Sequence, residues 1–316
     1  MSLDRQASQN APWRCTWEAW DANEHAHNLT DWSQEYDQFS RGAFYGRIDE
    51  VRLSEMQVFK EYTSNALGQQ CNVWPESLWI GIPVDGQSCR INGHQVGAQE
   101  VMCQPGGHDF ELVTPDRFGI YGLVVSRQWL TRAGAADDLL AADPERLMRL
   151  QLPDHTRQAT GFLIERLLGT QREQLSVKVH QDILSLALAE ILREETPNTE
   201  MPPSYGHRKQ VVDRIKAHLN ACEAPPVALS ELCEIAHVSQ RTLQYSFNSI
   251  LGISPIQFLR LTRLNRVRRR LSAPDTGTTV SQVAADWGFY HLGQFAQDYR
   301  QLFGEAPSVT LYRHAA

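Results

Sequence analysis

The segment "LSELCEIAHVSQRTLQYSF" at residues 229–247 contains the pattern of two short helices around a tight turn. In its first half, apolar residues recur at the spacing of one buried helical face: Leu229, Leu232, Cys233 and Ala236. Ser239 suits the start of the second helix, because its hydroxyl can accept an amide hydrogen that the first helical turn leaves unpaired. We therefore predict a helix-turn-helix unit.

The predicted second helix has two different faces. Its apolar stripe consists of Leu243, Phe247, Ile250 and Leu251. Arg241, Gln244 and Tyr245 lie on the other face. An arginine fork can pair with guanine, an amide can pair with adenine, and a phenol can contact phosphate. This face is therefore a candidate for base recognition; the alternative is the solvated surface of a small helical bundle.

The pattern occurs twice in the C-terminal third, which favours DNA recognition over the solvated surface. Leu243, Phe247, Leu251, Gly252 and Pro255 recur as Phe295, Tyr299, Phe303, Gly304 and Pro307, at a constant offset of 52 residues. We predict two tandem helix-turn-helix units joined by a helix over residues 254–272, with Pro255 in its first turn. Such a helix is about 27 Å long, and successive major grooves on one DNA face are about 34 Å apart.

The joining helix and the second unit differ in what they offer to DNA. Five arginines of the helix are candidates for supplying positive charge near the phosphates: Arg263, Arg266, Arg268, Arg269 and Arg270. Because a helix distributes consecutive residues around its axis, some of them are expected to pair with acids or cover the core instead. The second recognition face would consist of Leu292, Gly293, Ala296, Gln297 and Arg300. With fewer hydrogen-bonding side chains, it predicts looser sequence discrimination.

Charge separates the two ends of the chain. Residues 207–316 contain 13 lysines and arginines against 8 aspartates and glutamates, a net charge of +5, which leaves −12 for residues 1–206 of the total of −7. A basic segment on an acidic body indicates an anionic partner for that segment alone. The 316 residues, 42% of them hydrophobic, exclude general disorder and are enough for two domains.

The N-terminal half has a different pattern. Residues 40–130 read as short strands and turns typical of a β-sandwich or barrel, with a hairpin at Asn92-Gly93. Residues 157–195 then read as two helices. The segment "TPNTEMPPSYG" at 196–206 is rich in proline and polar residues and marks a linker. We expect domains at 1–195 and 207–316.

The cysteine pattern and the N-terminal residues predict the cellular compartment of the protein. The six cysteines form no CxxC pair, and the N-terminus lacks a basic start followed by an apolar run. No apolar stretch is long enough to span a bilayer. We expect a cytoplasmic protein without a membrane partner.

Residues 207–314 resemble the DNA-binding domain of the AraC/XylS family of bacterial transcription regulators. The resemblance rests on "LSELCEIAHVSQRTLQYSFNSILGISPIQFLRLTRLNRVRRRL" and on "VSQVAADWGFYHLGQFAQDYRQLFGEAPSVTLYR". It implies DNA-contacting positions in both units: Ser239, Gln240, Arg241, Thr242, Gln244, Tyr245, His291, Leu292, Gly293, Ala296 and Gln297.

The same resemblance implies an α+β protein. Its N-terminal domain would be a sensing and dimerising cupin-like β-barrel followed by helices, and its C-terminal domain would be all-α with two helix-turn-helix units. A weaker likeness is to the ethanolamine-operon activator branch. The resemblance also implies a small-molecule effector and contact with RNA polymerase.

Other sites in the N-terminal half were weighed against simple packing. His108 in "QPGGHDF" resembles a cupin metal turn, but the only close histidine pair is His25 and His27, so we expect no metal and no cofactor. Aromatic residues could line a ligand site or the core: Phe44, Tyr45, Trp74, Trp79, Phe110 and Tyr121. A dimer interface or the domain's own core would use Ile183, Leu184, Leu188, Ile191 and Leu192.

Together these features predict a homodimeric, effector-controlled transcription activator that binds double-stranded DNA and has no enzymatic activity. The alternatives are an architectural DNA-binding protein without an effector, and a cupin metalloenzyme fused to a helical module.

Overall fold

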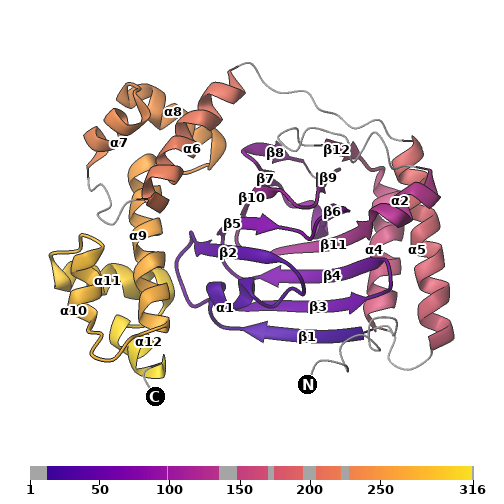
Figure 1. The fold of residues 1–316 in the computed structure, drawn as a ribbon, viewed down its shortest axis with the longest axis horizontal. Coiled ribbons are helices and arrows are strands. Elements are labelled where there is room, and N and C mark those ends of the chain that lie inside the picture. Colours follow the sequence, from indigo (N-terminus) through magenta and orange to yellow (C-terminus); the bar gives the residue numbers. More distant parts are fainter. Residues whose placement is uncertain are drawn as a thin grey trace. The chain divides into compact units, whose positions relative to one another are not determined.

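The structure is a computed structural model that describes residues 13–97, 99–134, 148–169, 174–194, 204–221 and 228–314. It separates into two compact units (Figure 1). The β unit comprises Met1–Glu35, Tyr45–Ser64 and Gln69–Glu200, and the helical unit comprises Tyr36–Phe44, Asn65–Gly68 and Met201–Ala316. Each unit is considered by itself.

Two antiparallel sheets are built from the strands of the N-terminal half. The larger sheet runs in the order β1 (Trp13–Ala19), β3 (Gly46–Arg52), β4 (Met56–Thr63), β11 (Phe118–Ser126), β6 (Ser77–Pro83), β9 (Glu100–Pro105) and β12 (Met148–Gln151). The smaller runs in the order β2 (Ser33–Gln38), β5 (Leu67–Asn72), β10 (Asp109–Thr114), β7 (Cys89–Ile91) and β8 (His94–Val96). Helix α1 (Ala22–Ala26) and the 3-10 turn η1 (Val84–Gly86) lie in connections.

The predicted barrel is not closed. Closure requires every edge strand to find a partner, yet among the described strands β1 and β12 end the larger sheet and β2 and β8 end the smaller one. The correct description of this half is two open sheets. The hairpin prediction is confirmed: Asn92 (φ 47°) and Gly93 (φ 82°) form the turn between β7 and β8, where a positive φ favours this residue pair.

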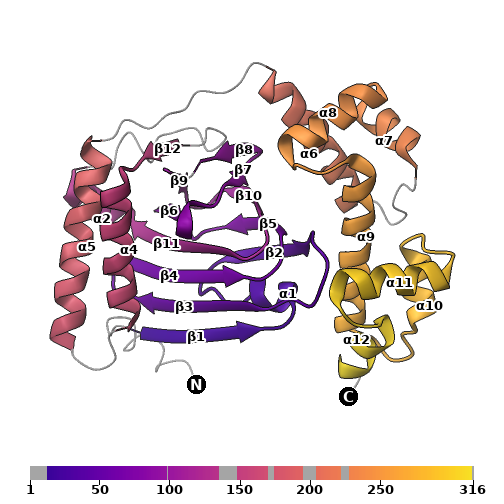
Figure 2. The same cartoon turned by 180° about the vertical axis from the view of Figure 1, so that it is seen from behind.

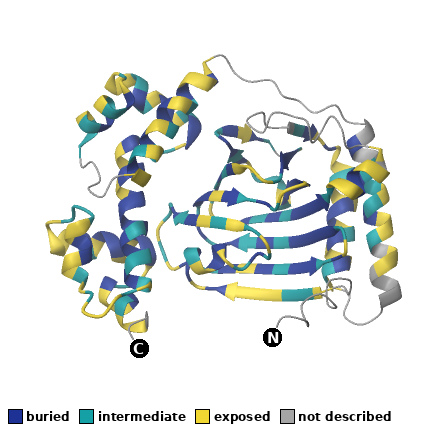
Figure 3. Ribbon diagram, viewed as in Figure 1, coloured by how far each residue is buried: buried dark blue, intermediate teal, exposed yellow. Residues whose placement is uncertain are grey.

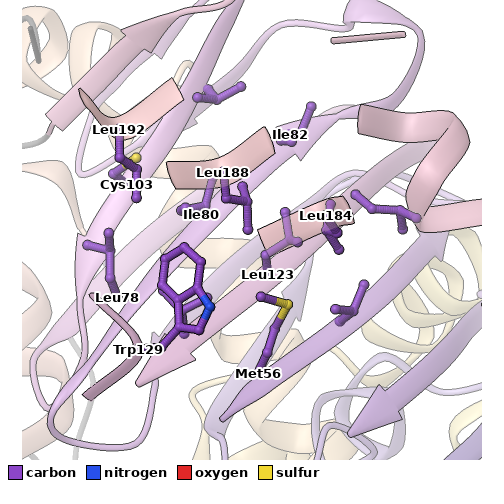
Figure 4. Packing of buried hydrophobic residues seen from close by; sticks show 14 of the residues in the cluster. Met56, Leu78, Ile80, Ile82, Cys103, Leu123, Trp129, Leu184, Leu188 and Leu192 are labelled. Atoms are coloured by element: carbon purple, nitrogen blue, oxygen red, sulfur yellow. The ribbon is translucent and has the colours of Figure 1, made fainter. Parts of the chain in front are cut away.

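Besides α1, the described part of the β unit contains the helices α2 (Arg127–Ala133), α4 (Asp154–Gly169) and α5 (Gln174–Glu194). Figure 1 shows α4 and α5 side by side. Leu184, Leu188 and Leu192 on α5 belong to the same buried cluster as Ile80 and Leu123 of the larger sheet (Figure 4). Burial of these leucines therefore fixes α5 to the sheet, and it uses three of the residues considered for a dimer interface.

The opposite side of α5 remains exposed. Val179, Ile183 and Leu186 follow one another at helical spacing and expose 50%, 44% and 72% of their surface. Figure 3 shows exposed residues along this helix. The side chain of Ile191 lies outside the described residues.

The C-terminal half is helical, as predicted. Its elements are α6 (Tyr205–Ala221), α7 (Leu229–Ala236), α8 (Gln240–Ile250), α9 (Pro255–Ser272), α10 (Val280–Asp286), α11 (Leu292–Phe303) and α12 (Pro307–His314). The pairs α7–α8 and α10–α11 are the two helix-turn-helix units. Residues 196–203 of the predicted linker lie outside the described residues.

Helix α9 joins the two helix-turn-helix units. Figures 1 and 2 show α6–α8 near one end of α9 and α10–α12 near the other. Phe258 of α9 contacts Phe247 of α8, with ring centroids 5.3 Å apart. On the other side, Leu264 and Val267 pack into one core with Phe295 and other residues of the second unit. Figure 3 shows α9 as mostly buried.

The helical unit also includes residues 36–44. The backbone N–H of Gln38 donates to Asn265 Oδ1 (2.9 Å), and Asn265 Nδ2 donates to the Gln38 carbonyl (3.0 Å). The Gln38 side chain and the Gly42 N–H both donate to the carbonyl of Leu302 near the end of α11 (2.6 and 3.0 Å). Phe39 packs against the core of the second helix-turn-helix unit. This 36–44 segment therefore binds α9 and caps α11.

No helix in the described ranges is both long enough and apolar enough to cross a membrane.

Candidate nucleic-acid interface

Helix α8 presents the first predicted recognition face. Ser239 caps it as expected, because its hydroxyl accepts from the Thr242 N–H (3.2 Å). The buried stripe of α8 consists of Leu243, Phe247 and Ile250. Opposite this stripe the predicted residues reach the surface, since Gln240 and Arg241 are exposed and Thr242 and Gln244 are half-buried. Packing of one face thus leaves the polar face open.

Arg241 and Tyr245 differ in how they are held. Within the described part of the chain, no hydrogen bond or ion pair engages Arg241, so its guanidinium is available to a ligand. Tyr245 is 61% exposed, and the guanidinium carbon of Arg208 lies 5.5 Å from its ring centroid. Arg208 is itself buried and donates to Ser204 (2.9 Å). This cation–π contact orients the ring from below.

Helix α11 presents the second face. His291, Leu292, Gly293 and Gln297 are exposed and Ala296 is half-buried, while Phe295, Tyr299 and Phe303 form the buried side. A β-carbon added to Gly293 would meet no atom within 4 Å. The surface at this position is therefore open enough for a DNA backbone to approach closely. Arg300 is exposed and, among the described residues, forms no ion pair.

The arginines of α9 lie mostly within internal contacts, which confirms that some pair with acids or cover the core. Arg263 donates to the carbonyl of Trp287 (2.7 Å), and Arg268 pairs with Glu305 (3.1 Å). Arg269 pairs with Asp37 (2.6 Å) and Arg270 with Asp275. Arg266 also makes internal bonds, to the end of α6. The basic run therefore holds the helical unit together more than it forms a phosphate-binding surface.

Burial shifts the pKa of two residues beneath the recognition faces. Burial lowers the pKa of Arg263, and burial raises the pKa of Tyr299 to about 12. The Tyr299 hydroxyl is hydrogen-bonded to Thr310 (2.8 Å). These shifted groups are part of the core, so they act on recognition only by fixing the helices.

The structure identifies further surface and supporting residues that the sequence analysis missed. Tyr290, in the turn before α11, is 77% exposed and lies next to the predicted contact His291. An aromatic side chain in the tight turn before a predicted recognition helix could have indicated a surface contact residue from the sequence. Arg208 supports Tyr245 from α6, and no sequence pattern indicates that contact.

The histidines considered as metal ligands lie in different surroundings. Among the described residues, no three histidine, cysteine or acidic side chains gather as a metal ion would require. His25 is buried against Glu61 (2.9 Å), whereas His27 contacts the Asn23 carbonyl. His108 lies exposed in its turn.

The six predicted aromatic residues do not form one group. Trp79 stacks on Phe110, with centroids 4.9 Å apart, and Trp32 contacts both rings. Tyr121 instead donates to Glu165 of α4 (2.8 Å), and Tyr45 lies beside Trp20. Trp79 and Phe110 therefore come together in the core.

Two helix-turn-helix units, each with an exposed second helix, define a DNA-binding domain. Comparison with known proteins agrees, because residues 232–313 match the family described as "Helix-turn-helix domain". A solved structure of a probable AraC family transcriptional regulator from Rhodopseudomonas palustris CGA009 is 36% identical, covering 33% of this chain and 96% of that one, with a TM-score of 0.30. The C-terminal part of the chain is therefore a helix-turn-helix domain.

Two relatives from Pseudomonas putida are also similar. The XylDLEGF operon transcriptional activator 2 is 43% identical over 89 residues, which is 28% of this chain and 57% of that protein. The XylDLEGF operon transcriptional activator 3 is 33% identical over 179 residues, which is 54% of this chain and 52% of that protein. The chain thus spans about half the length of these two relatives.

Replacing Arg241 should separate base recognition from general charge. Arg241→Ala is expected to weaken binding to the preferred DNA by about 1–3 kcal/mol and to relax the preference at one base pair. Arg270→Ala is the control, because it removes the same charge from a residue already paired with Asp275. Affinities for the preferred and scrambled duplexes would be compared. An equal loss on both DNAs would rule out base recognition by Arg241.

Proposed function

We propose that this chain is a cytoplasmic, sequence-specific transcription activator that binds double-stranded DNA through α8 and α11. The observation that carries this proposal is the repeated exposed face, with an unpaired Arg241 on one helix and an open Gly293 on the other. The names of the Pseudomonas relatives support transcription activation. Contact with RNA polymerase is part of the proposal and rests on the family resemblance. The ethanolamine-operon branch stays a prediction.

Selection of random duplex DNA by the purified full chain tests this function. We expect enrichment of two short sequence blocks about one helical turn apart, with affinity that falls as salt rises. The enriched DNA and a scrambled version would be titrated at two salt concentrations. Tight binding without enrichment would favour the architectural alternative instead, and absence of binding at low salt would contradict DNA binding altogether.

Control by a small-molecule effector is the second part of the proposal. The 36–44 segment supports it, because this segment continues directly into strand β3 of the β unit and also caps α11 through Gln38 and Gly42. A ligand-dependent movement of the adjoining strands would therefore change the end of a recognition helix. Asn265 holds the segment by bonding both backbone groups of Gln38.

Asn265→Ala tests whether the 36–44 segment affects DNA binding, and the test does not require the effector. It leaves a buried backbone N–H and carbonyl of Gln38 without these partners, at a cost of about 1–3 kcal/mol each. We expect faster amide exchange at residues 36–44 and at the end of α11, together with several-fold weaker binding to DNA that carries both blocks. Gln257→Ala, at an exposed position of α9, is the control. Faster exchange with unchanged DNA affinity would contradict a coupling role.

Homodimerisation is the third part of the proposal, and the outer side of α5 supports it. Val179, Ile183 and Leu186 form one exposed apolar stripe, opposite the leucines that pack on the sheet. Apolar stripes of this kind mark association surfaces more often than isolated exposed residues do. The buried leucines considered for the interface are therefore replaced in our proposal by their exposed neighbours.

Leu186→Glu should convert a dimer into a monomer, because it places a charge at the most exposed residue of the stripe. Gln181→Glu introduces the same charge on the same helix and should leave the dimer intact. Light scattering during size-exclusion chromatography gives the mass of each variant. A dimer that persists in Leu186→Glu would place the interface elsewhere.

A further inference from the structure

The two recognition helices lie in separately packed units, so some contact must fix their relative orientation. The first unit packs on the N-terminal part of α9 through Phe247 and Phe258. The second packs further along the same helix through Leu264, Val267 and Phe295. Apolar contacts tolerate small rotations, whereas directed hydrogen bonds fix an angle. A polar residue of α9 that bonds on both sides would therefore fix the angle between the units.

Arg266 makes such a double contact. Its guanidinium donates through Nη1 to the carbonyl of Leu219 (2.8 Å) and through Nη2 to the side chain of Asn220, both in the last turn of α6. The same guanidinium lies 5.1 Å from the ring centroid of Trp287, the C-cap residue of α10. Because α6 packs on α8, this one side chain links the helix that supports the first unit to the second unit.

The chemistry of each contact favours arginine. The last carbonyls of a helix have no partner within it and carry partial negative charge, so a cation there is stabilised. The edge of a guanidinium donates several hydrogen bonds while its flat face stacks on an aromatic ring. Lysine has the same charge but can provide neither the fork nor the flat face.

Trp287 is fixed from its other side as well. Arg263, one turn before Arg266, donates through Nε to the Trp287 carbonyl (2.7 Å), and its guanidinium carbon lies 4.4 Å from the ring centroid of Phe289. Phe289 in turn contacts Phe295 of α11, with centroids 5.1 Å apart. These contacts therefore connect Trp287 to α11, the second recognition helix.

We propose that Arg266 is a positioning residue that sets the spacing between the two DNA blocks that α8 and α11 recognise. This inference rests on the proposed function. Arg266 itself contacts no DNA in this scheme. It fixes the orientation of one unit relative to the other, so that both helices enter the DNA together only when their blocks lie at one separation.

The test compares full-length wild type with Arg266→Lys and Arg266→Ala on a series of duplexes. One duplex carries the two selected blocks at the selected spacing, others carry one, two or five inserted base pairs, and a last one carries the first block alone. Arg270→Lys and Arg270→Ala are matched controls on the same helix, since Arg270 bonds only nearby residues, Ala273 and Asp275, in the described part of the chain. Thermal denaturation confirms that each variant is folded, and Arg266→Lys retains the charge if Arg266→Ala does not fold.

We expect both Arg266 variants to lose affinity for the selected spacing by about five- to tenfold, while affinity for the first block alone stays at the wild-type value. The ratio between the selected and altered spacings should therefore shrink, and the Arg270 variants should keep the wild-type ratio. A purely structural role would instead lower affinity for every duplex alike and leave the ratio unchanged, which would overturn the inference. Wild type that binds no duplex, or binds all spacings equally, would overturn the proposed two-block recognition itself.

Discussion

The burial of α9 between two helix-turn-helix units is the constraint on which the helical unit depends. This helix carries a run of arginines, yet Val267 and Leu271 are completely buried and Arg263 and Arg268 nearly so. A helix of this composition can be buried only if its cations find partners, because an unpaired buried charge is too costly. Carbonyls, acids and aromatic rings of both units supply those partners, so the same contacts that permit burial also join the units.

This requirement explains which of the α9 arginines pair internally, a choice that the sequence left open. The basic run of residues 263–270 suggests a surface for phosphate, and counting charges could not tell a paired arginine from a free one. The pairing depends on Glu305, Asp37 and the Trp287 carbonyl, which are distant in sequence. Arg241 behaves differently, since it lies on the exposed side of a short amphipathic helix whose face the apolar spacing already fixes.

The features that depend on only a few neighbouring residues were predicted correctly from the sequence. The Ser239 cap, the Pro255 start of α9 and the Asn92-Gly93 turn follow from backbone chemistry within a few residues, and all three are present. Sheet closure and the membership of residues 36–44 in the helical unit depend on contacts between distant segments. No periodicity in "QFSRGAF" indicates that Gln38 bonds a side chain more than two hundred residues away.

The two recognition helices are unequal, and that inequality gives the joining helix its importance. Helix α8 offers an unpaired arginine and an amide, which can discriminate bases by hydrogen bonds. On α11, Leu292, Gly293 and Ala296 can only fit closely, so fewer hydrogen-bonding side chains remain there, Gln297 and Arg300 among them. A weak contact adds to affinity when a stronger one has already placed it near its target, because the second binding event then becomes intramolecular. That gain is largest when the connection is rigid and correctly oriented, since a flexible connection spreads the second helix over many positions. Under the proposed function, the internal pairing of the α9 arginines leaves fewer cations for phosphates, but it fixes the position from which α11 would contact DNA.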